Sequence, residues 1–154
     1  MDAYTSALTL LSRRELSTSQ LRERLARRHF EPGDIERALT RLTADGTLND
    51  RRVALACART DAAIKGHGRR RILQHVQQLG IDPDVAAAAV DEVFGDVDEA
   101  TLLETAIARR LRGSAIPTLD QRAKARLVRH LVARGFAPSA VFARLRRKGS
   151  EGDE

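Results

Sequence analysis

A short pattern occurs three times in this chain, and it constrains the fold more than any other feature. Phe30-x-Pro32, Ile81-x-Pro83 and Phe136-x-Pro138 each follow an amphipathic helical stretch and open another one. The offsets between the copies are 51 and 55 residues. Two-helix repeats are shorter, at roughly 33 to 47 residues, so this period favours about three helices per unit. Such repetition is typical of solenoid-like arrays, which usually present an extended binding surface.

Apolar positions line up between the three copies as well. The aligned sets are Leu21, Ile72 and Leu127; Leu25, Val76 and Leu131; Ile35, Ala86 and Val141; and Leu39, Val90 and Leu145. Their spacing predicts one apolar face on each helix, and no sustained alternation indicates a strand. His29 aligns with Gly80 and Gly135. The sequence therefore predicts an all-α fold of three tandem three-helix repeats, which form an elongated, curved, solenoid-like array.

The predicted boundaries follow from these copies. We expect repeat 1 at residues 1–48, repeat 2 at 49–95, a basic repeat 3 at 96–148, and a disordered acidic tail at 149–154. A single unit of this size buries too little surface to be stable alone, so neighbouring repeats must pack against one another.

Local signals place the nine expected helices. The first spans about residues 3–13 and the fourth about 50–65. Helix starts are predicted at the capping boxes Ser17-x-x-Gln20 and Thr118-x-x-Gln121, at Asn49-Asp50 and at Asp82-Pro83. Glycine-containing breaks are predicted at Gly66-His67-Gly68, at a turn around Gly95-Asp96, and at a flexible linker over Gly113–Pro117.

Composition limits the class of protein. Only 3% of the 154 residues are aromatic, against 42% hydrophobic overall, so Leu, Val, Ile and Ala must fill the core, as in helical bundles. The sequence shows no apolar run long enough to span a membrane and no secretory signal at Met1. The single Cys57 excludes an internal disulfide, and we expect a cytoplasmic monomer.

The positive charge is concentrated in one repeat. Residues 1–50 have no net charge and residues 51–100 have a net charge of −1, whereas residues 101–148 hold twelve Lys/Arg and two Asp/Glu, a net charge of +10. A local excess of this kind favours an anionic partner, such as a phosphate backbone or an acidic protein face, over a merely solvated surface.

Three basic clusters are the candidate contacts. Arg69, Arg70 and Arg71 begin a helix, where backbone N–H groups and guanidiniums together would suit a phosphate. Arg122, Arg126 and Arg129 share one helix face, and further cations gather at the last helix. The predicted partner-binding residues are Arg69, Arg70, Arg71, Arg122, Lys124, Arg126, Arg129, Arg134, Arg144, Arg146, Arg147 and Lys148. Because aromatics are scarce, contacts to single-stranded DNA should be made mainly to phosphates and should be sensitive to salt.

Catalytic chemistry is not indicated. His67 and His75 are eight residues apart across a glycine, which is not the spacing of a helical zinc pair, and the four histidines fit exposed helix ends. Cys57 lies on an apolar face, where an inert buried thiol is expected. Gly66-x-Gly68 lacks the further glycine and the preceding strand of a phosphate loop. We therefore predict no metal, no cofactor and no enzymatic activity.

Several blocks resemble the RecX regulatory proteins. The resemblance is carried by Ala7-Leu8-x-Leu10-Leu11-Ser12-Arg13-Arg14-Glu15-Leu16-Ser17-x-x-Gln20-Leu21-x-x-x-Leu25, Leu48-Asn49-Asp50 with Ala54, Lys65-Gly66-x-Gly68-x-x-x-Ile72 followed by Leu79-Gly80-Ile81, and Lys124-x-x-Leu127-x-x-x-Leu131-x-x-Arg134-Gly135-Phe136. It covers about residues 4–148. The chain departs from the family near Thr47, at Asn49-Asp50 and at Val53, where aromatic residues or a pair of acids are usual.

The resemblance implies both a fold and a function. It implies tandem three-helix repeats, in agreement with the pattern of the residues. It also implies a negative regulator that binds the RecA recombinase and lies in the groove of its filament on single-stranded DNA, where it inhibits the ATPase and strand exchange in DNA repair and the SOS response. Two alternatives remain open at this point: a stand-alone helical DNA-binding module that contacts phosphates, and an enzyme such as a nuclease, which the missing metal cluster disfavours.

Overall fold

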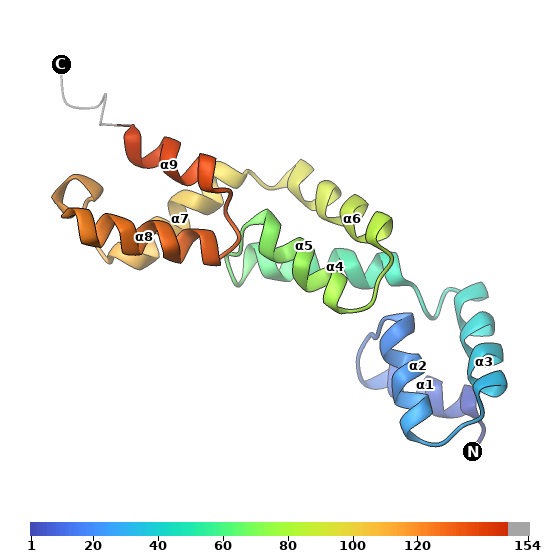
Figure 1. Ribbon diagram of the computed structural model, residues 1–154. Coiled ribbons are helices and arrows are strands. Elements are labelled where there is room, and N and C mark those ends of the chain that lie inside the picture. The colour runs from blue at the N-terminus through green and yellow to red at the C-terminus, as the bar shows by residue number, and fades with distance from the viewer. Residues whose placement is uncertain (148–154) are drawn as a thin grey trace.

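The computed structural model describes residues 1–147, and in that range the chain forms nine α-helices, one 3-10 turn and no strand. Three groups of three helices follow one another in an elongated, bent row, with α1–α3 at one end and α7–α9 at the other (Figure 1). The predicted fold class is confirmed. The elements are α1 (Ala3–Arg13), α2 (Thr18–Arg27), α3 (Pro32–Ala44), α4 (Asp50–Ala63), α5 (Arg69–Gln78), α6 (Pro83–Asp96), α7 (Glu99–Leu111), a 3-10 turn (Ile116–Thr118), α8 (Gln121–Ala133) and α9 (Pro138–Arg146).

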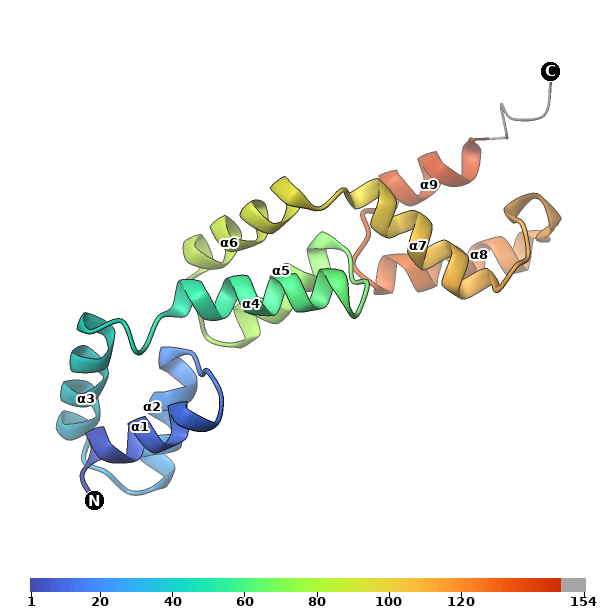
Figure 2. The same cartoon turned by 180° about the vertical axis from the view of Figure 1, so that it is seen from behind.

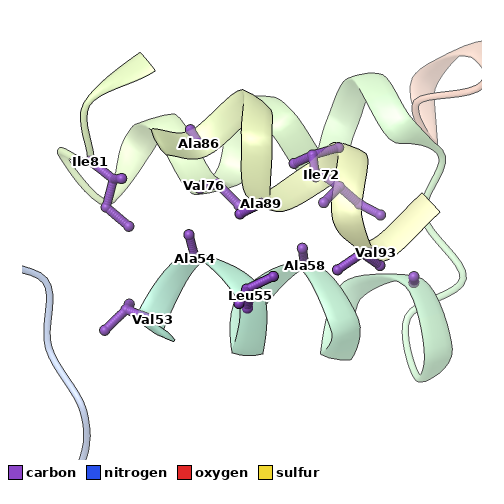
Figure 3. Close-up of a cluster of buried hydrophobic side chains, with 12 residues drawn as sticks. Val53, Ala54, Leu55, Ala58, Ile72, Val76, Ile81, Ala86, Ala89 and Val93 are labelled. Carbon is purple, nitrogen blue, oxygen red and sulfur yellow. The ribbon is translucent and has the colours of Figure 1, made fainter. Parts of the chain in front are cut away.

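Each group of helices has a hydrophobic core of its own. Separate clusters of buried side chains lie within α1–α3, α4–α6 and α7–α9. Of the twelve aligned apolar positions, eleven are buried and Leu145 is half-buried, so the sequence alignment identified the inward faces correctly. Figure 3 shows the central cluster, in which small residues such as Ala54, Ala58 and Ala89 let α4 and α6 approach closely.

Most of the predicted helix starts are confirmed. Ser17 and Gln20 form both halves of a capping box, and the side chains of Asn49 and Asp82 accept from backbone N–H groups at the starts of α4 and α6. The capping box at Thr118 is wrong. The Asp120 carboxylate accepts from the Ala123 amide at 2.8 Å, whereas the Thr118 hydroxyl donates to the Ala115 carbonyl inside the 3-10 turn.

Three boundaries differ from the prediction. Helix α4 ends at Ala63 rather than near residue 65, and α6 continues through Gly95 to Asp96, so the turn comes only at Val97. A 3-10 turn, Ile116–Thr118, takes up the last two residues of the predicted linker Gly113–Pro117. The expected acidic tail at residues 149–154 and Lys148 lie outside the described residues.

One helix end carries an unfavourable residue at a position that favours glycine. Gly80 and Gly135 follow α5 and α8 with φ of +75° and +101°, and the aligned His29 follows α2 with φ of +65°. A side chain disfavours this left-handed conformation, whereas glycine adopts it freely.

We therefore expect His29→Gly to stabilise the protein by about 0.5–1 kcal/mol, since the removed strain exceeds the entropy that glycine adds to the unfolded chain. Urea unfolding measures this directly. A control, His29→Ala, keeps a Cβ at the same position and should bring no comparable gain. Equal stability of the alanine and glycine variants would contradict the interpretation.

Neighbouring repeats meet at two equivalent joints. In the first joint, the Ser17 hydroxyl at the start of α2 donates to the Leu79 carbonyl at 2.5 Å, and the Thr18 amide donates to Asp50 at 2.7 Å. A Cβ atom added to Gly80 would collide with Ser19. The start of the second helix in one repeat thus packs against the glycine turn of the next repeat.

The second joint uses the same positions of the next pair of repeats. The Gly68 amide donates to the Arg134 carbonyl at 2.8 Å, and the Arg70 amide donates to the Gly135 carbonyl at 3.1 Å. A Cβ atom on Gly68 would lie 2.5 Å from the carbonyl carbon of Gly135, so only glycine allows this close approach. The Gly66-His67-Gly68 segment is therefore the docking point of repeat 3.

None of the helices in the described part of the chain has the length and apolar character needed to cross a membrane.

Candidate functional site

The Arg69 side chain makes contacts within the protein itself. Its guanidinium pairs with Asp91 of α6, lies 3.8 Å from a Glu99 carboxylate oxygen of α7, and sits 5.5 Å above the centre of the Phe94 ring. Arg69 occupies the place in the second joint that Thr18 occupies in the first, and Glu99 begins α7 as Asp50 begins α4. The structure thus gives Arg69 a role in joining repeats 2 and 3, and its charge is partly neutralised.

The start of α5 does not form the phosphate cradle that the sequence suggested. Two of its amides, those of Gly68 and Arg70, donate to carbonyls of the chain that follows α8. Arg71 is exposed, and its guanidinium donates to the Ala133 carbonyl at 3.3 Å. The side chains of Arg70 and Arg71 nevertheless lie beside the joint, where they add positive charge.

A basic pocket lies next to this joint. It is a depression of about 590 Å³ on α7 and α8, lined by Ala106, Arg109, Arg110, Arg112, His130 and Arg134, and its lining includes no carboxylate. We call these residues the basic pocket. Figure 2 shows α7 and α8 side by side at the C-terminal end of the array. Four guanidiniums around one depression form a concave surface that suits a phosphate or a carboxylate.

The cations of the pocket crowd one another. The pKa of Arg134 is lowered by burial and by the neighbouring charges of Arg71 and Arg109. The pKa of His130 is lowered below its usual value of 6.5 by burial, by Arg110 and by Arg134, so this imidazole is neutral at pH 7. An anion placed among these groups would relieve their mutual repulsion, which is a physical reason for it to bind.

Arg134 links the basic pocket in repeat 3 to the loop after α4 in repeat 2. Its guanidinium donates to the Lys65 carbonyl, and Arg109 lies near Gly66 on the same loop. The imidazole Nδ1 of His67, in that loop, is buried and has no hydrogen-bond partner among the described residues. Burial and the charges of Arg71 and Arg134 lower the pKa of His67, which is therefore also neutral at pH 7.

Arg112 sits in a strained conformation at the rim of the pocket. It follows α7 with φ of +47°, a left-handed conformation that costs an arginine about 1 kcal/mol. Glycine does occur in this turn, but at the next position, Gly113, and not at position 112.

We expect Arg112→Gly to raise the free energy of unfolding by about 0.5–1 kcal/mol while it weakens anion binding, because it removes strain and charge together. Urea unfolding and a salt titration of binding to single-stranded DNA measure the two effects. The parallel variant His29→Gly should show only the gain in stability. A loss of stability in Arg112→Gly would contradict the assigned strain.

The predicted face on α8 is present. The side chains of Arg122, Arg126 and Arg129 are all exposed, and no ion pair engages them within residues 1–147. This outer face lies on the same helix as His130 of the basic pocket. It gives repeat 3 a second positive surface.

The remaining predicted residues divide into different environments. Lys124 and Arg147 line an apolar depression of about 650 Å³ with residues of the 3-10 turn. Arg144 is half-buried, and its guanidinium pairs with Glu104, which ties α9 to α7. Arg146 is exposed at the end of α9, and Lys148 lies outside the described residues.

Sequence reasoning missed the run Arg109-Arg110-x-Arg112. Its charge was counted in the total for residues 101–148, but cations at a helix C-terminus are favourable by themselves, so the run carries no specific signal. Only the packing of α7 against α8 and the second joint shows that these side chains surround Arg134 and His130.

Cys57 is half-buried, whereas the sequence suggested a buried thiol. Burial raises its pKa to about 11, and the charge of Asp61 acts in the same direction, so the thiol stays protonated at pH 7. The histidines fit the prediction less well. Only His29 is exposed, whereas His67, His75 and His130 are half-buried.

The fold and this site define a class: an array of three-helix repeats with a basic surface in its last repeat. Residues 3–42 match the family model described as RecX, first three-helix domain, and residues 49–90 match RecX, second three-helix domain. The chain is 34% identical over 141 residues to the regulatory protein RecX of Syntrophotalea carbinolica, covering 92% of both chains. It is 34% identical to that of Halorhodospira halophila, covering 90% of this chain and 83% of the relative.

Solved structures agree with the fold. The crystal structure of RecX from Lactobacillus salivarius superposes with a TM-score of 0.77 at 19% identity, covering 92% of this chain and 90% of that one. A second RecX crystal structure gives a TM-score of 0.78 at 23% identity, covering 95% of this chain and 70% of that one. This chain belongs to the RecX family of regulatory proteins.

Proposed function

We propose that this protein is a negative regulator of the RecA recombinase that binds the RecA filament on single-stranded DNA. It lies in the groove of the filament as a monomer in the cytoplasm, and it inhibits the ATPase and strand exchange during DNA repair. Relatives described as regulatory protein RecX support a regulatory role rather than a catalytic one. The observation that carries the proposal furthest is the basic pocket in the last repeat of an elongated body, beside the second joint.

The distribution of charge supports different binding roles for the first two repeats and for repeat 3. Repeats 1 and 2 are close to neutral, and their exposed arginines are often paired, as in Arg22–Glu36 and Arg51–Glu92. Repeat 3 carries the basic pocket and the outer face of α8. We infer that the first two repeats contact protein surface along the groove, while repeat 3 reaches phosphates or an acidic face of RecA.

Length favours this arrangement. An elongated body can contact several protomers of a filament at once, and contacts made in series raise the overall affinity well above that of each one. The two joints preserve the alignment of these contacts, because hydrogen bonds fix each repeat to the next, through side chains in the first joint and between backbones in the second.

The deciding experiment measures the DNA-dependent ATPase of RecA on saturated single-stranded DNA while this protein is titrated in at amounts well below RecA. We expect inhibition at amounts too small to cover the DNA. Binding to naked DNA is measured in parallel at the same salt concentration. Inhibition that appears only when the protein coats the DNA would contradict an action on the filament.

The second candidate is a stand-alone DNA-binding module, which is favoured by the exposed cations on α8 that form no ion pair within residues 1–147. In that case binding to naked DNA should be tight, independent of RecA and strongly weakened by salt. A higher affinity for preformed filament than for naked DNA at equal salt rejects this alternative.

A further inference from the structure

Helices α4 and α5 bring together three side chains of metal-binding type, away from the basic pocket. Cys57 and Asp61 are one turn apart on α4, and His75 reaches them from α5. The Cys57 Sγ lies 3.3 Å from the His75 Nδ1, which lies 2.6 Å from the Asp61 Oδ2. All three donor atoms lie within 4.8 Å of one another.

This contact is not the relay of a catalytic triad. In a triad the nucleophile and the carboxylate contact different nitrogens of the imidazole, whereas here both face Nδ1. Nδ1 can donate to Asp61 or accept from the thiol of Cys57, but in either tautomer one of the two contacts lacks a well-directed hydrogen bond. A cation held between the three atoms would instead interact favourably with all of them.

We propose that Cys57, Asp61 and His75 bind a divalent metal ion of the Zn²⁺ type. Sulfur and imidazole nitrogen are ligands that zinc prefers. With the usual bond lengths, donor atoms of a tetrahedral site lie about 3.3–3.6 Å apart, so the 3.3 Å separation of Sγ and Nδ1 already fits. The Asp61 Oδ2 must withdraw from Nδ1 by about 0.8 Å, which a small rotation of the carboxylate provides.

The surroundings of Asp61 suit this role. Its side chain is 2% exposed, and its other oxygen, Oδ1, lies 3.3 Å from the Lys65 ammonium. Oδ2 is thus left for the metal, while Lys65 orients the carboxylate from the opposite side, as outer partners of metal ligands commonly do. When the metal binds, the thiol of Cys57 releases its proton.

The depression above these residues leaves room for a fourth ligand. It measures about 280 Å³ and is lined by Cys57, Asp61, His75 and Lys65 together with Glu15 of repeat 1. Glu15 pairs with Arg52. Three protein ligands with water in the fourth position is an arrangement that zinc adopts in proteins.

A metal here would brace the part of repeat 2 that holds repeat 3. It would tie α4 to α5, and the backbone carbonyl of Asp61 accepts from the His67 amide at 3.0 Å. His67 lies in the loop that ends at Gly68 in the second joint. Metal binding should therefore stabilise both repeat 2 and the attachment of repeat 3.

Cobalt(II) is the probe for the test, because a thiolate bound to cobalt gives a charge-transfer band in the near ultraviolet. Untagged, metal-free, full-length protein is titrated with Co²⁺, and Zn²⁺ is then added as a competitor. We expect one Co²⁺ per chain, a sulfur charge-transfer band, and displacement by Zn²⁺. Cys57→Ser should abolish the band, and His75→Gln should weaken binding at least about tenfold.

The matched control is His29→Gln, which removes an exposed histidine from repeat 1 and should leave the titration unchanged. As a second measurement, Zn²⁺ should raise the unfolding temperature of the unaltered protein but not that of Cys57→Ser. His75→Gln keeps the cysteine and gives an independent result if Cys57→Ser folds poorly. A Co²⁺ spectrum without the sulfur band, or equal affinity in the unaltered protein and His75→Gln, would overturn the proposal.

Discussion

Replacing Arg109, Arg110 and Arg112 together by glutamine should lower affinity for the RecA filament on single-stranded DNA by about 100-fold. The estimate takes about 1 kcal/mol for each lost charge-assisted contact. If the three side chains contact phosphates of single-stranded DNA, the slope of log affinity against log salt should also fall by about 2. Fluorescence anisotropy of labelled DNA in preformed filaments, measured at several salt concentrations, tests both values.

The control removes the same number of charges elsewhere. Arg13, Arg14 and Arg59 are exposed in repeats 1 and 2 and form no ion pair within the part of the chain that the structure describes. Their triple glutamine variant should lose less than about tenfold in affinity, because only the long-range attraction falls. Equal losses in the two triple variants would mean that net charge, and not the basic pocket, determines binding.

A third triple variant separates the two basic surfaces of repeat 3. Charge reversal of Arg122, Arg126 and Arg129 alters the outer face of α8 and leaves the lining of the basic pocket in place. Weakened filament binding would assign contact to that outer face as well. Unchanged inhibition by this variant, if it is folded, would reject the outer face and leave the basic pocket as the contact surface.

Replacing Gly68 by alanine should detach repeat 3 from repeat 2. The backbone of Gly68 has ordinary dihedral angles, so the expected harm comes only from the added Cβ, which would lie 2.5 Å from the Gly135 carbonyl carbon. Overpacking of this kind costs about 1–3 kcal/mol, and separation of the two backbones also breaks the hydrogen bonds from Gly68 and Arg70. Hydrogen exchange at the Arg70 amide should accelerate first, before the core of α4–α6 is affected.

Gly33→Ala is the matched control. An added Cβ at Gly33 meets only the end of the Arg37 side chain at 3.5 Å, and the residue lies inside α3. Alanine there should be neutral or stabilising by up to about 1 kcal/mol. Protection of the Arg70 amide that is unchanged in Gly68→Ala would contradict the role assigned to the second joint.

The inward faces of the helices were predictable because burial repeats with the helical period. Leu21, Ile72 and Leu127 occupy the same place in three cores, and their spacing alone indicated it. Helix starts were predictable where a side chain meets its own backbone, as in Ser17 and Gln20. The helix cap predicted at Thr118 is wrong because a second side-chain acceptor, Asp120, lies two residues further on. Its carboxylate is a stronger acceptor for the backbone N–H groups at the start of α8 than the threonine hydroxyl.

The candidate sites were predictable only in part. A concentration of charge in residues 101–148 is visible in the sequence, but it does not show which cations face one another. Arg69 looked like a phosphate ligand and proved to be paired across the second joint, while Arg109 and Arg110 gave no signal of their own. Cys57, Asp61 and His75 come from two helices, and no local spacing relates the histidine to the other two.

The sequence by itself determined the repeats, their helices, their cores and the basic character of the last one, because each follows from the spacing and the charge of residues within a single repeat. The tertiary structure alone decided how the repeats join and which charges gather around the basic pocket. Those features depend on backbone approaches between residues more than sixty positions apart, such as Gly68 and Gly135. A glycine at such a point looks like any other turn residue until the chain that packs against it is in place.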